Sequence, residues 1–227
     1  MKILSNGVAV IGDEDILSRE IKARGLCSDL MVRHSILQHI KPGDVIVDGG
    51  AAMGDHTVAY LEAVGPTGRV LAFEPNPDFL ECLRHNCPKA EIHDRFLWDS
   101  DCEFYLHSPI ENVGAGYLTS SPVNRPGETT HGPLHSIQLD DLHLDRLNFM
   151  KLDLEGAELF ALQGGHQTIQ RCRPKIVLEM NPGPSARFGL TAKDVYDLLD
   201  SWNYAHHSIR NQPGDYCTDC DILAVPL

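Results

Sequence analysis

The sequence lacks long apolar runs and is short of basic residues. No stretch of its 227 residues approaches the length that spans a bilayer, and residues 1–15 carry one lysine and only a broken apolar patch. These absences argue against a membrane span and a signal peptide, so we expect a cytoplasmic protein. The chain has 19 Lys and Arg against 32 Asp and Glu, a formal net charge of −13. This balance disfavours nucleic acid and anionic membranes as partners, because both bind through basic side chains.

Internal repeats and a linker are also absent from the sequence, and its length suits one hydrophobic core. We therefore predict a single domain over residues 1–227. Short β-rich runs alternate with amphipathic stretches of helix length, which indicates an α/β fold with a doubly wound, mostly parallel sheet. The expected strands are 44–50, 69–75, 91–99, 102–107, 147–156, 175–182 and 221–227. The expected helices are 55–64, 78–86, 157–171 and 191–202.

Two segments fall outside this alternation. Residues 1–40 predict an N-terminal helical extension of one or two helices, over 14–25 and 28–40. Residues 108–136 contain four glycines and four prolines without periodicity, which predicts a long loop. Long loops inside compact domains are often functional, so we interpret this one as a lid or substrate-recognition loop. Two of its histidines, His131 and His135, could reach over a bound substrate, although each is expected mainly as a surface residue.

A glycine-rich turn follows the first buried strand, in "VIVDGGAAMGDHT" at residues 45–57. Counted from Gly49, it is close to the dinucleotide fingerprint G-x-G-x-x-G. Counted from Asp48, it is close to the D-x-G-x-x-x-G turn of methyltransferases that use S-adenosylmethionine (SAM). Glu74, which ends the second strand 20 residues after Gly54, would bind the ribose hydroxyls of either cofactor. The turn alone therefore leaves both cofactors open.

Three features favour SAM over a dinucleotide. Ala51 occupies the position where a dinucleotide turn needs its second glycine. Asp48 would repel a pyrophosphate, but an acid there suits the amino-acid end of SAM. A later strand ends in "KLDLEGAEL", with carboxylates at 153, 155 and 158, and no second nucleotide-binding half is visible. An NAD-dependent oxidoreductase stays open as an alternative, as does a SAM-binding module that has lost catalysis.

A series of motifs then carries a family resemblance. In chain order they are "VIVDGGAAMGDHT", "GRVLAFEPNP", "LDDL", "FMKLDLEGAELFALQGG", "KIVLEMNP" and "ILAVP". From about residue 41 to its end, the chain resembles the FkbM-type SAM-dependent methyltransferases. The resemblance implies a seven-stranded, Rossmann-like class I methyltransferase fold. It also implies O-methylation of a small molecule, most often a sugar or a secondary metabolite.

The resemblance implies a set of cofactor-binding residues by position. It places a SAM turn after the first strand, ribose contacts after the second strand, adenine contacts near residue 97 and an acid near the transferred methyl. These residues are Asp48, Gly50, Ala52, Gly54, His56, Thr57, Glu74, Pro75, Asn76, Leu97, Trp98, Asp99 and Asp153. The first motif of the family commonly reads D-V-G-A-N-x-G, and Ala52 stands here at the position of the Asn. Any contact of that Asn side chain is therefore lost.

An alcohol acceptor must lose a proton during methyl transfer, so a base near the methyl group assists the reaction. Asp153, which directly ends an apolar strand, is the first candidate, with Glu155 or Glu179 orienting the substrate. His56, at the edge of the cofactor turn, is the alternative base. The three carboxylates could also hold a divalent cation. Their spacing is not diagnostic of a metal site, so we predict base catalysis without a metal.

A second candidate metal site stands near the end of the chain. "CTDC" at residues 217–220 has metal-like spacing, and His206 and His207 precede it. Adjacent histidines rarely both face one metal ion, so we interpret Cys217 and Cys220 as two incidental thiols in a surface hairpin. The sequence carries no signal for the oligomeric state.

Overall fold

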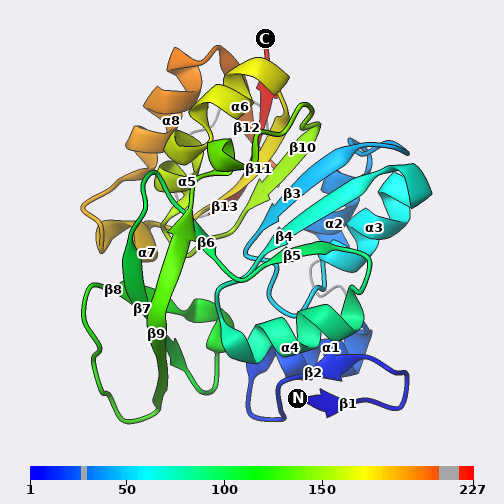
Figure 1. Cartoon of the computed structure of the whole chain (residues 1–227), viewed down its shortest axis with the longest axis vertical. Coiled ribbons are helices and arrows are strands. Elements are labelled where there is room, and N and C mark those ends of the chain that lie inside the picture. The colour runs from blue at the N-terminus through cyan, green and yellow to red at the C-terminus, as the bar shows by residue number, and fades with distance from the viewer. Residues whose placement is uncertain (27–29, 210–219) are drawn as a thin grey trace.

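The computed structural model describes residues 1–26, 30–209 and 220–227, and a seven-stranded sheet forms its centre (Figure 1). From one edge to the other the strands are β12 (Tyr204–Ser208), β13 (Cys220–Pro226), β11 (Lys175–Met180), β10 (Phe149–Leu152), β3 (Val45–Gly49), β4 (Arg69–Phe73) and β5 (Glu91–His93). β13 runs antiparallel to both of its neighbours, and the other pairs are parallel. The expected mostly parallel, seven-stranded sheet is confirmed.

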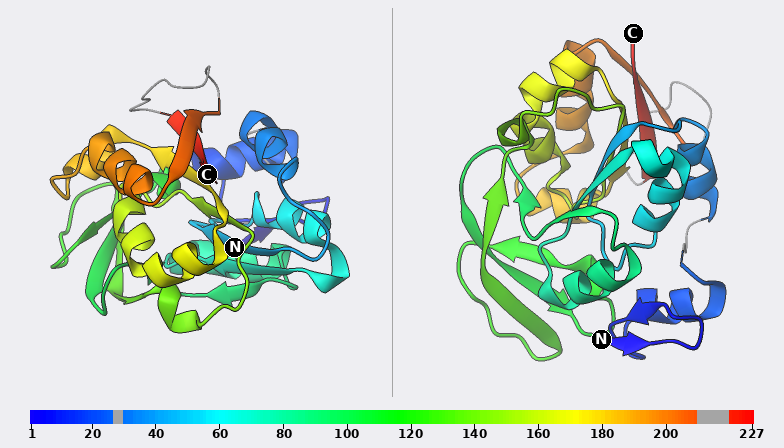
Figure 2. Two further views of the ribbon diagram at one scale, coloured as in Figure 1. Left: turned by 90° about the horizontal axis from the view of Figure 1, so that it is seen from above. Right: turned by 45° about the vertical axis from the view of Figure 1, so that its right-hand side comes forward.

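Helices cover both faces of this sheet, as the view from above in Figure 2 shows. Val45 and Val47 pack into one helix layer, whereas Ile46 between them packs into the other, because successive side chains of a strand point to opposite faces. The first layer contains α5 (Glu158–Gly164), α6 (His166–Cys172) and α8 (Ala192–Ser201), and the second contains α2 (Leu30–Leu37) and α3 (Thr57–Val64). None of the helices in the described ranges combines the length and the apolar character that a membrane span requires.

The winding of the sheet reverses between β3 and β10. β4 and β5 lie on one side of β3, whereas β10 and β11 lie on the other side. Gly49 of β3 pairs in register with Leu152 of β10, so the segments that follow both strands begin next to each other. Ligands of open α/β sheets bind at such a switch point, outside the carboxyl ends of the strands. The fold thus predicts a site directly after Gly49 and Leu152.

Two expected elements are each divided in the structure. The helix expected over 157–171 is interrupted at Gly165 and forms α5 and α6. Glycine is a poor helix former, and Gly164 also packs against the Trp98 carbonyl. The strand expected over 91–99 becomes β5 and a separate β6 (Phe96–Leu97), which belongs to a different sheet. The hydrophobic pattern of a segment shows whether it is a helix or a strand. It does not show where a helix is interrupted or where a strand leaves one sheet for another.

The expectation of a long loop over 108–136 is wrong. The segment forms β8 (Tyr117–Thr119) and most of β9 (Glu128–Ile137), which pair with β7 (Glu103–Pro109) in a sheet of order β6-β9-β7-β8. A register shift between Phe104 and Leu106 interrupts the β7–β9 pairing. Such an irregularity breaks the alternating pattern by which strands are recognised. The role of this segment as a lid or recognition element stays a prediction.

The N-terminal extension contains the two expected helices, α1 (Ile16–Arg24) and α2, and also an unexpected hairpin of β1 (Lys2–Ile3) and β2 (Ala9–Val10). The hairpin packs against α4 (Pro77–Asn86), where Asn86 hydrogen-bonds both the amide and the carbonyl of Ala9. Asp15 caps α1 and accepts a second bond from the Val113 amide, 3.0 Å away. Through these contacts the N-terminal segment lies at the same end of the molecule as β7–β9 (Figures 1 and 2).

Gly164 offers a test of how tightly α5 packs. Replacing a helical glycine by alanine normally stabilises a helix by about 0.5–1 kcal/mol. At Gly164 the added Cβ would lie 1.9 Å from the Trp98 carbonyl oxygen, so Gly164→Ala forces the backbones apart. We expect the free energy of unfolding, measured with urea, to fall by about 1–3 kcal/mol or more. Gly12→Ala is the control, because its Cβ would meet nothing within 4 Å. Equal stability of Gly164→Ala and the wild type would contradict this packing.

Candidate active site

A cavity of about 380 Å³ opens at the switch point of the sheet. Its size suits a small molecule, since ligand pockets span roughly 300–1,000 Å³. Its walls come from the loops after β3, β4, β10 and β11, together with α1, α4 and the segment around β8. Ten of the residues expected from the sequence line it, namely Gly50, Ala52, His56, Glu74, Pro75, Asn76, Leu97, Asp153, Glu155 and Glu179.

The other expected residues do not line the cavity. Asp48 is wholly buried and accepts a hydrogen bond of 2.6 Å from Thr57, which joins β3 to α3. At Gly54 an added Cβ would lie 2.6 Å from Cys87, so this glycine allows the turn to pack against α4. Trp98 stacks on Phe160 with ring centres 4.0 Å apart. Asp99, also outside the lining, accepts a hydrogen bond from Ser100.

The backbone of the glycine turn packs closely against the neighbouring strands. Gly50 has φ 77°, and a Cβ there would lie 1.9 Å from the Asp153 carbonyl oxygen, so only glycine fits. The amides of Gly50 and Ala51 both donate to the carbonyl of Phe73, which fixes the turn against the end of β4. Ala52 follows with φ 46°, a left-handed conformation in which Asn is more easily accommodated than Ala. The left-handed backbone at this position therefore explains why the usual motif has Asn there.

Glu74 is held rigidly at the cavity wall. One carboxylate oxygen accepts from the Ala52 amide and the other from the Asn76 amide, both at 2.8 Å. The residue is 6% exposed, and this burial raises the pKa of its carboxyl to about 7 although the two amides oppose the shift. The turn after β3 and the end of β4 are thereby tied together by one side chain that still faces the cavity.

Lys151 is the functional residue that our sequence reasoning missed. It is buried, and its Nζ lies 3.1 Å from Asp153 and 4.0 Å from Asp48, with the Gly50 carbonyl at 3.3 Å. Burial alone would lower the pKa of Lys151, but the surrounding carboxylates outweigh it and raise that pKa. A signal was present, because a lysine inside the apolar run "FMKL" needs a buried partner.

Three carboxyl groups meet at the cavity beside Lys151. Oxygens of Asp153, Glu155 and Glu179 lie within 4.8 Å of one another, an arrangement that could also hold a metal ion. Burial opposes ionisation of Asp153, but Lys151 lowers its pKa below the ordinary value. Burial and the neighbouring Asp153 raise the pKa of Glu155 to about 8 and that of Glu179 to about 10. Near neutral pH, Asp153 is therefore ionised while the two glutamates tend to hold protons.

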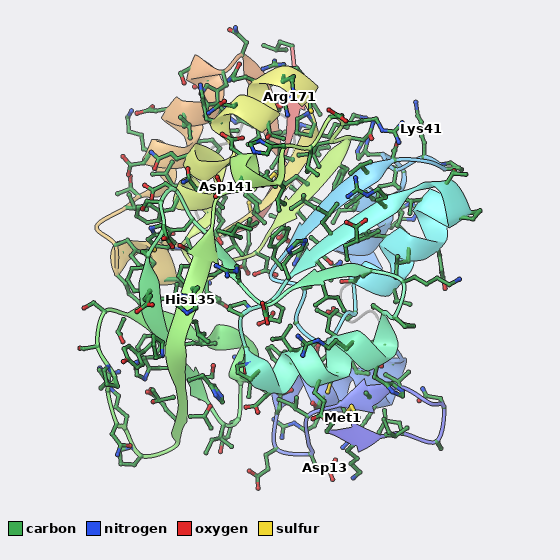
Figure 3. The ribbon with its side chains drawn as sticks, viewed as in Figure 1. Met1, Asp13, Lys41, His135, Asp141 and Arg171 are labelled. Carbon is green, nitrogen blue, oxygen red and sulfur yellow. The ribbon has the colours of Figure 1, made fainter. Side chains whose placement is uncertain are left out.

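The expected histidines divide into two groups. His56 lines the cavity, with Nε2 3.6 Å from Asp55 and a buried Nδ1 that has no hydrogen-bond partner within the described ranges. His131 instead pairs with Asp78, and His135 on β9 lies 3.3 Å from Glu103 (Figure 3). Neither of these two lines the cavity. The idea that they reach over a bound substrate therefore finds no support in their placement.

The candidate metal site at Cys217, Cys220, His206 and His207, which we did not favour from the sequence, cannot be assembled from the described residues. Cys217 lies outside them, and Cys220 is disulfide-bonded, so the interpretation of the "CTDC" cysteines as free thiols is wrong at Cys220. His206 hydrogen-bonds Asp200 at 2.9 Å. Within the part of the chain that the structure describes, the acidic group at the cavity is the metal-like cluster, and it contains neither His206 nor His207.

Comparison with known proteins identifies the family to which the chain belongs. The model of the methyltransferase FkbM domain matches residues 48–205, which includes the whole switch point. The chain belongs to the FkbM methyltransferase family. The resemblance inferred from the motifs is thereby confirmed.

Two curated relatives and two solved structures illustrate the similarity. "Methyltransferase 1" of Beauveria bassiana is 27% identical over 52% of this chain and 57% of its own length. Hexuronic acid methyltransferase AglP of Haloferax volcanii is 26% identical over 78% of this chain and 70% of its own. The methyltransferase FkbM structure from Methylobacillus flagellatus has a TM-score of 0.52 at 17% identity, covering 85% of this chain and 50% of that one. SMU.1697c of Streptococcus mutans, solved with SAH, has a TM-score of 0.50 at 9% identity, covering 86% and 94%.

These likenesses establish the fold of an FkbM methyltransferase domain. The chain spans little more than half the length of the Beauveria relative and half that of the Methylobacillus protein.

Lys151 offers a test of the charge arrangement at the site. Lys151→Met leaves Asp48 buried without a cation, and we expect the free energy of unfolding at pH 7 to fall by about 3–5 kcal/mol. The loss should shrink at lower pH, because protonated carboxyls no longer need the lysine. In the wild type, the lowered pKa of Asp153 contributes stability that is present above the ordinary value of 3.8 and is lost as the pH falls through the folded value.

Lys193→Met is the matched control for this test. Lys193 forms an exposed ion pair with Asp197 on α8, and such pairs contribute about 0.3–0.5 kcal/mol. Denaturation of both variants by urea at several pH values separates the two cases. A small, pH-independent effect of Lys151→Met would contradict the buried ion pair.

Proposed function

We propose that the chain is a SAM-dependent methyltransferase that methylates a hydroxyl group of a sugar or another hydroxylated metabolite. The observation that carries the proposal is the buried carboxyl of Glu74 beside the glycine turn at the switch point of an FkbM-family fold. The similarity to a hexuronic acid methyltransferase supports a sugar as acceptor.

The residues present fit SAM as a cofactor. Glu74 offers carboxylate oxygens to ribose hydroxyls, and Gly50 and Ala52 allow close approach of the backbone. Phe96 and Leu97 give the same cavity an apolar wall that suits a purine ring. Bound there, SAM would supply a methyl group on a positively charged sulfur.

The acceptor would occupy the other half of the cavity. Glu155 and Glu179 face it together with Tyr117 and Phe188. Carboxyl groups beside aromatic rings suit a sugar, because hydroxyls bind to the carboxyls while the apolar face of the ring packs on the aromatic side chains. This half of the site is formed by residues from β8, β11 and the loop after β10.

The acid–base roles follow from the electrostatics of the cluster. A base that removes a hydroxyl proton works best when its pKa is close to the operating pH. Lys151 makes Asp153 a weak base, whereas Glu155 has a pKa raised to about 8. We therefore assign proton acceptance to Glu155 and orientation of the hydroxyl to Asp153 and Glu179. His56 is retained as the alternative base because it lines the same cavity.

Two rival functions are less well supported. An NAD-dependent oxidoreductase would have to place a pyrophosphate beside the turn that Asp48, Glu74 and Asp153 surround with acid. A SAM-binding module without catalysis would have no use for carboxyl groups with raised pKa values in the cavity. A metal-independent reaction, a cytoplasmic location and the absence of a nucleic acid partner stay predictions from the sequence.

The two halves of the site are separable by mutation. Glu74→Ala removes the fixed carboxyl, so we expect SAM binding measured by calorimetry to be lost. Asp153→Ala should lower kcat mainly, with a smaller effect on SAM affinity. Glu81→Ala on the exposed side of α4 is the control for both measurements. Near-wild-type activity of both Glu74→Ala and Asp153→Ala would overturn the assignment of the site.

The raised pKa of the Glu155 carboxyl predicts how the reaction depends on pH. Only its ionised form accepts a proton, so kcat should rise with pH through about 8, the raised pKa of its carboxyl. Glu155→Gln should lower kcat by about 10²–10⁴-fold and remove this rise. Glu179→Gln is the comparison, because an amide imitates the neutral carboxyl that its raised pKa maintains, and we expect a smaller loss. A pH profile unchanged by Glu155→Gln would exclude this residue as the base.

A further inference from the structure

The guanidinium groups of two arginines lie close to the ring of Tyr117, which lines the half of the cavity proposed for the acceptor. The guanidinium carbon of Arg187 lies 4.7 Å from the ring centre, and that of Arg125 lies 5.6 Å from it. Arg187 follows α7 (Pro182–Ala186), and Arg125 precedes β9, so distant parts of the chain bring them together. Tyr117 itself lines the cavity, as does Phe188 directly after Arg187.

Neither guanidinium forms an ion pair or a side-chain hydrogen bond within the described ranges. This is unexpected in a chain with 32 acidic and 19 basic residues, where acidic partners are in excess. Other arginines of the chain are engaged, for example Arg69 with Glu91 and Arg146 with the Gly43 carbonyl. Both Arg125 and Arg187 are exposed and therefore available to a ligand.

The Tyr117 ring beside the two arginines is fixed by neighbouring side chains. His107 is wholly buried, stacks on Tyr117 and hydrogen-bonds Thr119 and Thr130 on the flanking strands. The Tyr117 hydroxyl donates to Glu128 at 2.8 Å. Ring and strands therefore hold their positions without a ligand. Arg187 also exerts an electrostatic effect on the carboxyl of Glu155, so its charge is felt inside the cavity.

We propose that the acceptor carries an anionic group, a carboxylate or a phosphate, that Arg187 and Arg125 bind at the rim of the cavity beside Tyr117. This inference rests on the proposed function, since it concerns the acceptor of the same site. The planar guanidinium fork matches carboxylate and phosphate oxygens and binds them through two parallel hydrogen bonds. The raised pKa values of Glu155 and Glu179 reduce the negative charge that such an acceptor would meet.

The test compares acceptor analogues that differ only in charge. The full-length protein, saturated with S-adenosylhomocysteine, is titrated by calorimetry with three matched pairs: glucuronate and glucose, galacturonate and galactose, and glucose 6-phosphate and glucose. We expect at least one acid to bind about tenfold or more tightly than its neutral partner, as a charged hydrogen bond provides. The uronates and the phosphate together distinguish a carboxylate acceptor from a phosphorylated one.

Variants then assign the preference to the two arginines. Arg187→Gln and the double variant with Arg125→Gln should remove the preference for the acid, while binding of S-adenosylhomocysteine is unchanged. Arg187→Lys should keep part of the preference, because it keeps the charge and loses the fork. Arg84→Gln, at an exposed arginine of α4, is the matched control and should leave the preference intact.

The outcomes separate this inference from the proposed function. If no acid binds more tightly than its neutral partner, or if the double variant keeps the preference, the anion site is overturned while the methyltransferase proposal stands. If S-adenosylhomocysteine fails to bind the wild type, the proposed function itself fails. Both arginines are exposed, so circular dichroism should show native folding in every variant.

Discussion

The buried ammonium group of Lys151 is the interaction on which the site depends. It stands between β3 and β10, where the winding reverses, and neutralises acids from the ends of both strands. Asp48 is wholly buried, and without a cation its ionised form would be costly in this environment. With Lys151 in place, Asp48 can use its other oxygen to hold Thr57 and thereby the first turn of α3. One positive charge thus stabilises a turn, a helix start and an ionised Asp153.

The same charge gives the acids of the cavity different properties. Asp153 is next to the lysine and its pKa is lowered, whereas Glu155 and Glu179 are close to Asp153 and their pKa values are raised. Three carboxyls of one chemical type can therefore have separate roles, since burial and neighbours set each protonation state. Glu74 is a fourth case, in which burial raises the pKa and two backbone amides fix the orientation.

The cavity is completed by parts of the chain outside the central sheet. Residues of β7, β8 and the segment between them line one wall, and Asp15 of the N-terminal segment bonds the amide of Val113 in that lining. Figure 1 shows the N-terminal segment and β7–β9 at the same end of the molecule. These additions enclose the half of the cavity that we assign to the acceptor, while the central sheet holds the half that we assign to the cofactor. The division agrees with the general rule that specificity is built on loops and small strands around a shared fold.

The sequence by itself determined six of the seven strands of the central sheet, all but β12, and most of the residues that we assign to the cofactor. Apolar runs ending in acids predict buried parallel strands, and the glycine at position 50 requires a turn that no other residue can form. These signals are local, so they can be recognised without the fold. Of the candidate site, ten expected residues line the cavity, whereas Asp48 and Thr57 proved to support it from behind.

The tertiary structure alone decided the charge states and the acceptor half. The role of Lys151 depends on acids from two strands that are about one hundred residues apart in the chain, and no periodicity reveals such a pairing. The strands of 108–136 escaped recognition because β8 is short, the pairing of β9 with β7 is irregular in register, and the segment is rich in glycine and proline. Arg125 and Arg187 are ordinary surface residues in the sequence, and only folding brings both onto the ring of Tyr117. Local patterns encode elements, whereas the environment that sets a pKa or forms a binding site arises when distant elements pack together.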